Sequence, residues 1–157
     1  YEFTEMEKPP MYWILSPSAD GTTAVPTIKL DYRYDNRIFW IDISSYAVVV
    51  QLPPLAESSI GTKFKFILNE DSEGENSKNF GIITDNTHTD IHGFISVANT
   101  GMHLTADTSS VYWDTSDAVA RAGDWCELIT DGTAWYITGR AVEANAIDIA
   151  DGHDVTT

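Results

Sequence analysis

The sequence predicts an all-β fold, an antiparallel β-sandwich or a small jelly-roll-like β-barrel with an extended N-terminal arm. Short runs of β-branched and aromatic residues alternate along the chain with clusters of Gly, Asp and Asn. Helical periodicity is hard to find, and the 17 Thr against 7 Leu favour pleated sheet. The length of 157 residues suits one compact domain plus an arm.

Residues 1–27 are predicted to form the arm, and residues 28–157 a single antiparallel β domain. Four prolines in residues 1–27 forbid a continuous strand ladder there. The arm also carries an apolar cluster that would be costly to leave exposed, since burying each large side chain contributes ~1.5–3 kcal/mol. We expect the domain or a neighbouring subunit to cover this cluster. It consists of Met11, Tyr12, Trp13, Ile14 and Leu15.

Strands are expected at residues 27–34, 38–43, 47–52, 62–68, 80–84, 91–97, 101–105, 109–113, 125–130 and 133–138. In residues 62–68 the alternation places Phe64, Phe66 and Leu68 on one face. The last two strands are predicted to form a hairpin, because Asp-Gly at 131–132 supplies the positive φ angles that a tight primed turn requires. Trp125 and Trp135 are expected to pair across this hairpin.

Short helical turns are expected at residues 117–121 and 141–146, neither long enough to define the fold. Asp35 and Asn36 predict a turn between the first two strands.

The charge of the chain excludes several classes of function. It has 24 Asp+Glu against 9 Lys+Arg, a formal net charge of −15, which opposes nucleic-acid binding through a basic surface and repels anionic membranes. Its apolar runs are far shorter than the ~18–20 residues that a membrane span requires. The single cysteine, Cys126, excludes an intramolecular disulfide framework and an all-cysteine zinc site.

The sharpest metal-binding pattern is formed by His88, Asp90 and His92. On a strand, residues i, i+2 and i+4 point the same way, so two imidazoles and a carboxylate could bind a divalent ion. The surrounding polar sequence favours a surface turn instead, and no cofactor is expected.

An acidic stretch, residues 69–76, matches the first half of an EF-hand loop. It places oxygen-bearing side chains at the first, third and fifth positions and glycine at the sixth. Phe80 stands at the twelfth position, where a bidentate Glu is required, so a solvated loop is the favoured interpretation. Calcium binding at this loop remains the open alternative.

The sequence contains no nucleophile elbow, phosphate-binding glycine loop or His-Glu-x-x-His motif. The chain is therefore not expected to be an enzyme. Its five tryptophans could stack on sugar rings if several lined one exposed face, although core or subunit-interface positions are the favoured interpretation.

Several stretches resemble a family of small β-rich virion proteins of tailed bacteriophages. They are DNRIFWID at residues 35–42 leading into VVVQLP at 48–53, GTKFKFI at 61–67, and GDWCELITDGTAWYITG at 123–139. This order of segments is similar to a module of capsid decoration proteins and of tail-fibre or tail-spike proteins. Residues 1–27 have no counterpart in the pattern.

The resemblance implies a structural role without catalytic residues. The leading expectation is a capsid decoration or cement protein, a homo-oligomer and by analogy a trimer, on the virion capsid surface, where it contacts the major capsid protein. The apolar cluster of the arm, residues 11–15, would make the oligomer or capsid contacts. The alternatives are a tail-fibre or tail-spike module that binds host surface glycans, and a small metal-binding or hydrolytic β domain.

Overall fold

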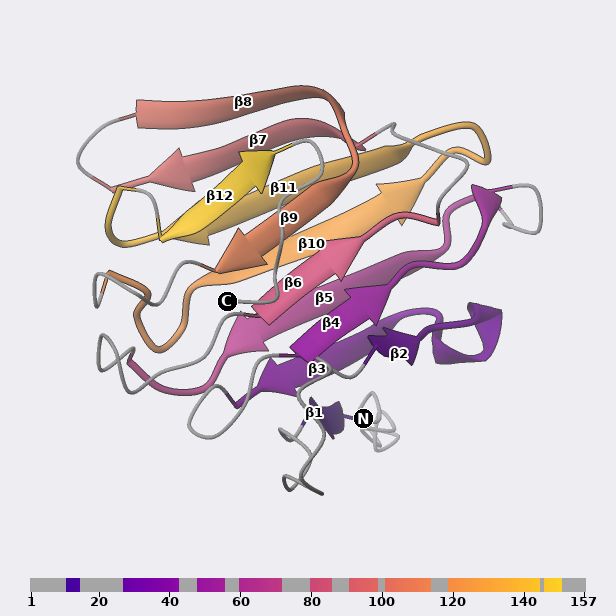
Figure 1. Ribbon diagram of the computed structural model, residues 1–157, viewed down its shortest axis with the longest axis horizontal. Helices are drawn as coiled ribbons and strands as arrows, with labels where there is room; N and C mark the ends of the chain where they lie inside the picture. The colour runs from indigo at the N-terminus through magenta and orange to yellow at the C-terminus, as the bar shows by residue number, and fades with distance from the viewer. Residues whose placement is uncertain are drawn as a thin grey trace, which may run out of the picture.

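The computed structural model describes residues 11–14, 27–42, 48–55, 60–71, 80–85, 91–98, 101–113, 119–144 and 146–150. The described chain is mostly β-structure in twelve strands (Figure 1). The strands are β1 Met11–Ile14, β2 Thr27–Lys29, β3 Arg37–Ile41, β4 Val48–Gln51, β5 Lys63–Leu68, β6 Phe80–Ile83, β7 Ile91–Val97, β8 Gly101–Thr108, β9 Ser110–Trp113, β10 Trp125–Thr130, β11 Trp135–Ala141 and β12 Ile147–Ala150.

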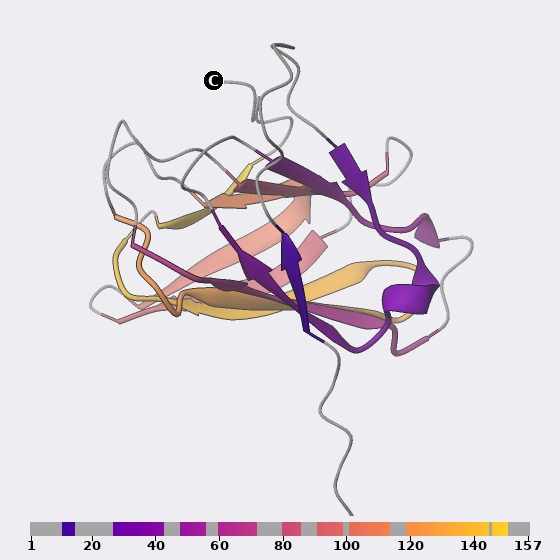
Figure 2. The same cartoon turned by 90° about the horizontal axis from the view of Figure 1, so that it is seen from below.

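The strands form two sheets that lie one over the other in two layers (Figure 2). The seven-stranded sheet has the order β1-β3-β5-β10-β11-β7-β8, and the five-stranded sheet has the order β12-β9-β6-β4-β2. Half of the ten pairings between described strands are parallel, so the prediction of purely antiparallel sheets was wrong. Neither sheet closes into a barrel.

The core lies between the sheets and is rich in aromatic rings. Phe66 of β5 contacts Phe80 of β6 with ring centroids 5.9 Å apart, which joins the two layers. Phe39 stacks on Phe66 at 5.2 Å, and Phe80 meets Trp113 edge-on at 5.3 Å. All four side chains are at least 97% buried. The Nε1 atom of Trp113 has no hydrogen-bond partner among the described residues, a cost that this packing offsets.

The predicted alternation in β5 is confirmed, because Phe64, Phe66 and Leu68 are fully buried and the residues between them are not. The turn at residues 35–36 is also confirmed, with Asn36 in the left-handed region at φ 57°. The strand predicted over residues 27–34 stops at Lys29. A 3₁₀-helix, η1 (Tyr32–Tyr34), follows it because the Asp31 carboxylate accepts a hydrogen bond from the Arg33 N–H at 2.9 Å.

The hairpin of β10 and β11 is confirmed, but its predicted tight turn is wrong. Thr130 and Trp135 are the last register partners, so a four-residue loop connects the strands. Oδ1 of Asp131 accepts hydrogen bonds from the N–H groups of Thr133 and Ala134, at 2.8 and 2.9 Å. These bonds hold the pKa of Asp131 far below its usual range.

Trp125 and Trp135 do not form the expected cross-strand pair. Trp125 is the register partner of Arg140, at the other end of the hairpin from Trp135. The predicted helical turns are also wrong where they are described, since residues 119–121 and 141–144 contain no helix. Strand β12, Ile147–Ala150, follows this segment and was not among the predicted strands.

The apolar cluster of the predicted arm falls partly in the described chain. Met11–Ile14 form β1, which pairs in parallel with β3 at one edge of the seven-stranded sheet (Figure 1). The backbone of this segment therefore extends the sheet. Leu15 and the rest of the predicted arm, residues 1–10 and 16–26, lie outside the described residues.

Trp135 tests the aromatic core directly. Its side chain is 1% exposed and its ring centroid lies 5.8 Å from that of Phe64. We expect Trp135→Ala to lower the free energy of unfolding by ~3–5 kcal/mol, measured by urea denaturation, because a large cavity replaces the indole. Ile129→Ala is the matched control, since Ile129 is 40% exposed and lies on the opposite face. Equal losses for both variants would contradict the described core.

The low pKa of Asp131 predicts that its contribution to the free energy of unfolding depends on pH. Because the pKa of the folded carboxylate is depressed, its stabilisation is present above the unfolded pKa of about 3.9 and is lost as pH falls toward the folded pKa. The loss of unfolding free energy in Asp131→Ala, measured in urea, should therefore be largest near neutral pH and shrink below about pH 4. Asp131→Asn keeps an acceptor oxygen but cannot titrate, so its difference from Asp131→Ala should stay constant with pH. If the loss of unfolding free energy in Asp131→Ala did not change with pH, the low pKa of Asp131 in the folded state would be refuted.

Candidate functional site

The outer face of the seven-stranded sheet, the side away from the five-stranded sheet, is unusually apolar. Along β3, β5 and β10 the buried residues alternate with partly exposed ones, and many of these outward positions are aliphatic or aromatic. A sheet face in contact with water normally carries polar residues instead. The apolar outward side chains are Ile38, Trp40, Ile67, Phe94, Trp125, Ile129 and Tyr136.

Three of these side chains are exposed to a similar extent, Phe94 at 40%, Ile129 at 40% and Tyr136 at 41%. Ile129 and Tyr136 are register partners across β10 and β11, and Tyr136 is in turn the partner of His92 on β7. The rings of His92 and Tyr136 lie 5.9 Å apart. Apolar and aromatic side chains therefore lie side by side across β10 and β11 in the middle of the sheet, as at sites of association with other molecules.

Basic side chains lie within this face. Lys65 is the register partner of Ile38 on one side and of Glu127 on the other. Its Nζ atom lies 4.3 Å from the ring centroid of Trp125, a cation–π contact that fixes the position of the ammonium group. Lys63 lies two residues earlier on the same strand and face.

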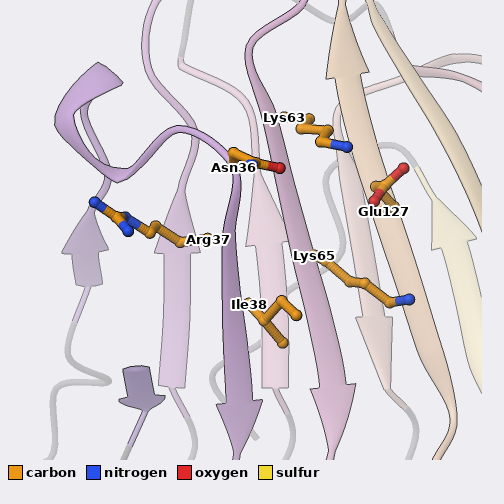
Figure 3. A pocket seen from close by; sticks show the side chains of 6 residues that line it. All are labelled: Asn36, Arg37, Ile38, Lys63, Lys65 and Glu127. Atoms are coloured by element: carbon orange, nitrogen blue, oxygen red, sulfur yellow. The ribbon is translucent and has the colours of Figure 1, made fainter. Parts of the chain in front are cut away.

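A shallow hollow of about 250 Å³ lies beside these lysines. Figure 3 shows the side chains of Lys63 and Lys65 extending toward the side of Glu127, whereas Arg37 extends in the opposite direction. The hollow is lined by Asn36, Arg37, Ile38, Lys63, Lys65 and Glu127.

The face has a charge opposite to that of the chain as a whole. Lys63, Lys65 and Arg140 are three of only nine Lys+Arg in the sequence, whereas Glu127 is the one outward acid of β3, β5, β10 and β11 among 24 Asp+Glu. The outward side of these four strands is thus locally basic on a chain with a net charge of −15. A partner that combines acidic and apolar groups fits this surface.

Asp124 positions the beginning of β10 and hence Trp125. It is 1% exposed, and its two oxygens accept hydrogen bonds from the N–H groups of Val142 at 2.9 Å and Arg121 at 2.8 Å. Burial raises the pKa of this carboxyl group, and the two hydrogen bonds oppose that rise. The two carboxylate oxygens of Asp124 therefore connect the segment before β10 with the segment after β11. The role of Asp124 is structural.

Cys126 offers no nucleophile. Its side chain is fully buried, and burial raises the pKa of the thiol far above its ordinary value. A thiol in this state is inert at neutral pH.

The predicted metal pattern is only partly described. His92 lies on β7 at the outer face, whereas His88 and Asp90 lie outside the described residues. In the acidic stretch, Asp71 accepts a hydrogen bond from the Ala122 N–H at 2.8 Å and so helps to fix a turn. Within the part of the chain that the structure describes, no group of three or more His, Cys, Asp or Glu is placed to hold a metal ion.

The sequence interpretation missed the outer face, although its signal was present. In β5, Ile67 follows the two lysines on the polar side of an otherwise clean alternation, and in β3 both sides of the strand are apolar. Such outward apolar residues mark a surface only when neighbouring strands place them side by side. The register of the sheet supplies that information.

No family model matches the chain, and no curated protein matches it. None of the helical structure in the described ranges is long and apolar enough to cross a membrane.

Asp124→Asn tests the support of β10. The amide keeps one acceptor oxygen but turns an N–H₂ group toward a buried N–H donor, so we expect a loss of ~1–3 kcal/mol in the free energy of unfolding. Asp71→Asn is the matched control because Asp71 is exposed and uses one oxygen, Oδ1, in its bond to Ala122. Its loss in the same urea denaturation should stay below about 0.5 kcal/mol. If Asp124→Asn left the free energy of unfolding unchanged, one of the two hydrogen bonds from Val142 and Arg121 would be dispensable for stability.

Proposed function

We propose that this chain is a structural protein of a tailed-bacteriophage virion, a capsid decoration protein built on a jelly-roll-like β-sandwich. The observation that carries the proposal is the group of exposed apolar and aromatic side chains on the outer face of the seven-stranded sheet. A protein of this kind works by adhesion, binding to assembled subunits and stabilising the shell without transforming a substrate. The resemblance of residues 35–53, 61–67 and 123–139 to phage virion modules supports the same class.

The composition of the outer face suits association with another protein. Stable interfaces are enriched in aromatic residues and depleted of acidic side chains at their centre. Trp125, Tyr136 and Phe94 supply the rings, and Glu127 is the one outward acid of β3, β5, β10 and β11. Association would release water from this surface at ~25 cal/mol per Å² of apolar area buried.

The proposed partners are further copies of the chain, by analogy in a trimer, and the major capsid protein. Strand β1 places residues 11–14 at the edge of the same sheet, one strand from Ile38 and Trp40. Four of the predicted contact residues, 11–14, therefore lie on the strand next to β3 in the sheet order. Both features would then belong to one association surface.

Binding of host glycans is the second candidate. The specific observation in its favour is the exposure of the Phe94 and Tyr136 rings on a sheet, with the Trp125 ring and Lys65 on the same face. Exposed rings on such a surface stack on sugars, and charged groups beside them select acidic sugars. This candidate uses the same face and would place the chain in a tail fibre or tail spike.

The double variant Phe94→Asp/Ile129→Asp tests the proposed function. It places two carboxylates in the apolar face, so its binding to empty shells of the encoding phage should fall at least tenfold in co-sedimentation. Val142→Asp is the matched control, because Val142 is 42% exposed and lies beyond β11. Melting curves establish that both variants are folded.

Two results would overturn the decoration proposal. One is shell binding by Phe94→Asp/Ile129→Asp equal to that of the unmodified chain. The other is the absence of shell binding together with capture of the unmodified chain on immobilised host polysaccharide, which would favour the tail-fibre candidate.

A further inference from the structure

We infer that the outer face of the seven-stranded sheet receives residues 1–7 of a second copy of this chain. The inference deepens the proposed function, on which it rests for the adhesive role of the face, by naming an occupant. Residues 1–7 have the sequence YEFTEME. The segment combines three carboxylates with three apolar side chains, and the face combines cations with apolar and aromatic side chains.

Charge complementarity selects this occupant. Glu2, Glu5 and Glu7 carry the negative charge of the segment, which contains no cation before Lys8. On the face, Lys63 and Lys65 lie two residues apart on one strand, both directed toward the side of Glu127 (Figure 3). Opposite charges brought together as water is excluded gain more than they would at an exposed position.

The apolar groups are complementary as well. Tyr1, Phe3 and Met6 are interspersed with the acids of the segment. On the face, the exposed Ile129 is the register partner of Lys63, and Tyr136 is the partner of Ile129 on its other side. A segment with both kinds of side chain can bury its apolar groups on the face while its carboxylates meet the ammonium groups. An acidic segment without rings would leave the apolar surface exposed.

Within one copy, β1 begins at the end of the sheet that carries the hollow, so docking on the sheet of the same copy is the alternative that the experiment must exclude. Met11 is the register partner of Ile38, so the chain enters β1 beside the end of β3 that carries Asn36 and Arg37, residues that line the hollow. The sheet order places Lys65 two strands from β1, about 10 Å away at the usual strand spacing. The seven residues span at most ~25 Å when extended, which is enough to cross several strands.

The two prolines before β1 favour a second copy over the same copy. Pro9 and Pro10 have no N–H, so they cannot donate to the parallel ladder between β1 and β3. Consecutive prolines prefer a stiff extended conformation, and Pro also restricts the residue before it. A sharp reversal onto the same copy's sheet is therefore disfavoured at Lys8-Pro9-Pro10, whereas a neighbouring copy requires none.

Reciprocal charge reversal tests this inference on the full chain. One variant carries Lys63→Glu and Lys65→Glu, and the other carries Glu2→Lys and Glu5→Lys. We expect each variant alone to self-associate about tenfold more weakly than the unmodified chain in sedimentation velocity, because both interacting surfaces then have the same sign. Lys29→Glu is the control, since this exposed lysine belongs to β2 of the other sheet and should leave association unchanged.

An equimolar mixture of the two variants is decisive. Each copy then offers the other a face and a segment of opposite charge, so two of the three contacts of a closed trimer are restored and the mixture should associate several-fold more strongly than either variant alone. Docking within one copy would leave both variants mismatched in the mixture. Circular dichroism and melting temperatures show that both variants are folded.

Failure of the mixture to associate would overturn the inference, as would a monomeric unmodified chain or undiminished association of either variant. These outcomes are separate from those of the shell-binding experiment. A monomer that binds shells through the outer face would preserve the proposed function while excluding the second copy as occupant.

Discussion

The aromatic packing between the two sheets is the constraint on which the rest of the molecule depends. Phe66 and Phe80 join the layers, and Phe39 and Trp113 extend the contact into each sheet. Because these inner rows already fill the core, the apolar residues on the outer face are not needed to hold the fold together. Exposed rings and aliphatic side chains on one sheet face favour aggregation, so their presence at Tyr136 and Phe94 supports the proposal that this face binds a partner.

The path of the chain explains why the sheets are mixed. From β1 to β7, successive strands alternate between the two sheets, so each strand's sequence neighbours lie in the opposite layer. Strands two apart in sequence then become partners, and β1–β3, β3–β5, β2–β4 and β4–β6 are all parallel. Hydrophobic alternation identifies a strand and its buried face but does not specify its sheet. The sequence therefore located most strands correctly while the antiparallel assumption failed.

The same limit separates what could be predicted of the site from what could not. Phe64, Phe66 and Leu68 were assigned correctly because their alternation is local, and the Asp-Gly pair correctly located the hairpin. The loop length was missed because the Asp131 carboxylate binds two N–H groups and favours a wider turn. The outward apolar residues were visible in the sequence, but the outer face they form could not be predicted, since it depends on the register of β5, β10 and β11.

The high negative charge of the chain would not by itself prevent the proposed association of its copies. At physiological ionic strength the Debye length is about 8 Å, so acids remote from an interface contribute little to repulsion between copies. In the proposed association the relevant charges are those on or beside the outer face, where Lys63, Lys65 and Arg140 are accompanied by Glu127 and Asp131, the latter bonded to the Tyr136 O–H. Acidic groups elsewhere on the chain repel one another and so disfavour unspecific contacts. A few cations gathered on one apolar face would then orient an acidic partner on a strongly acidic protein.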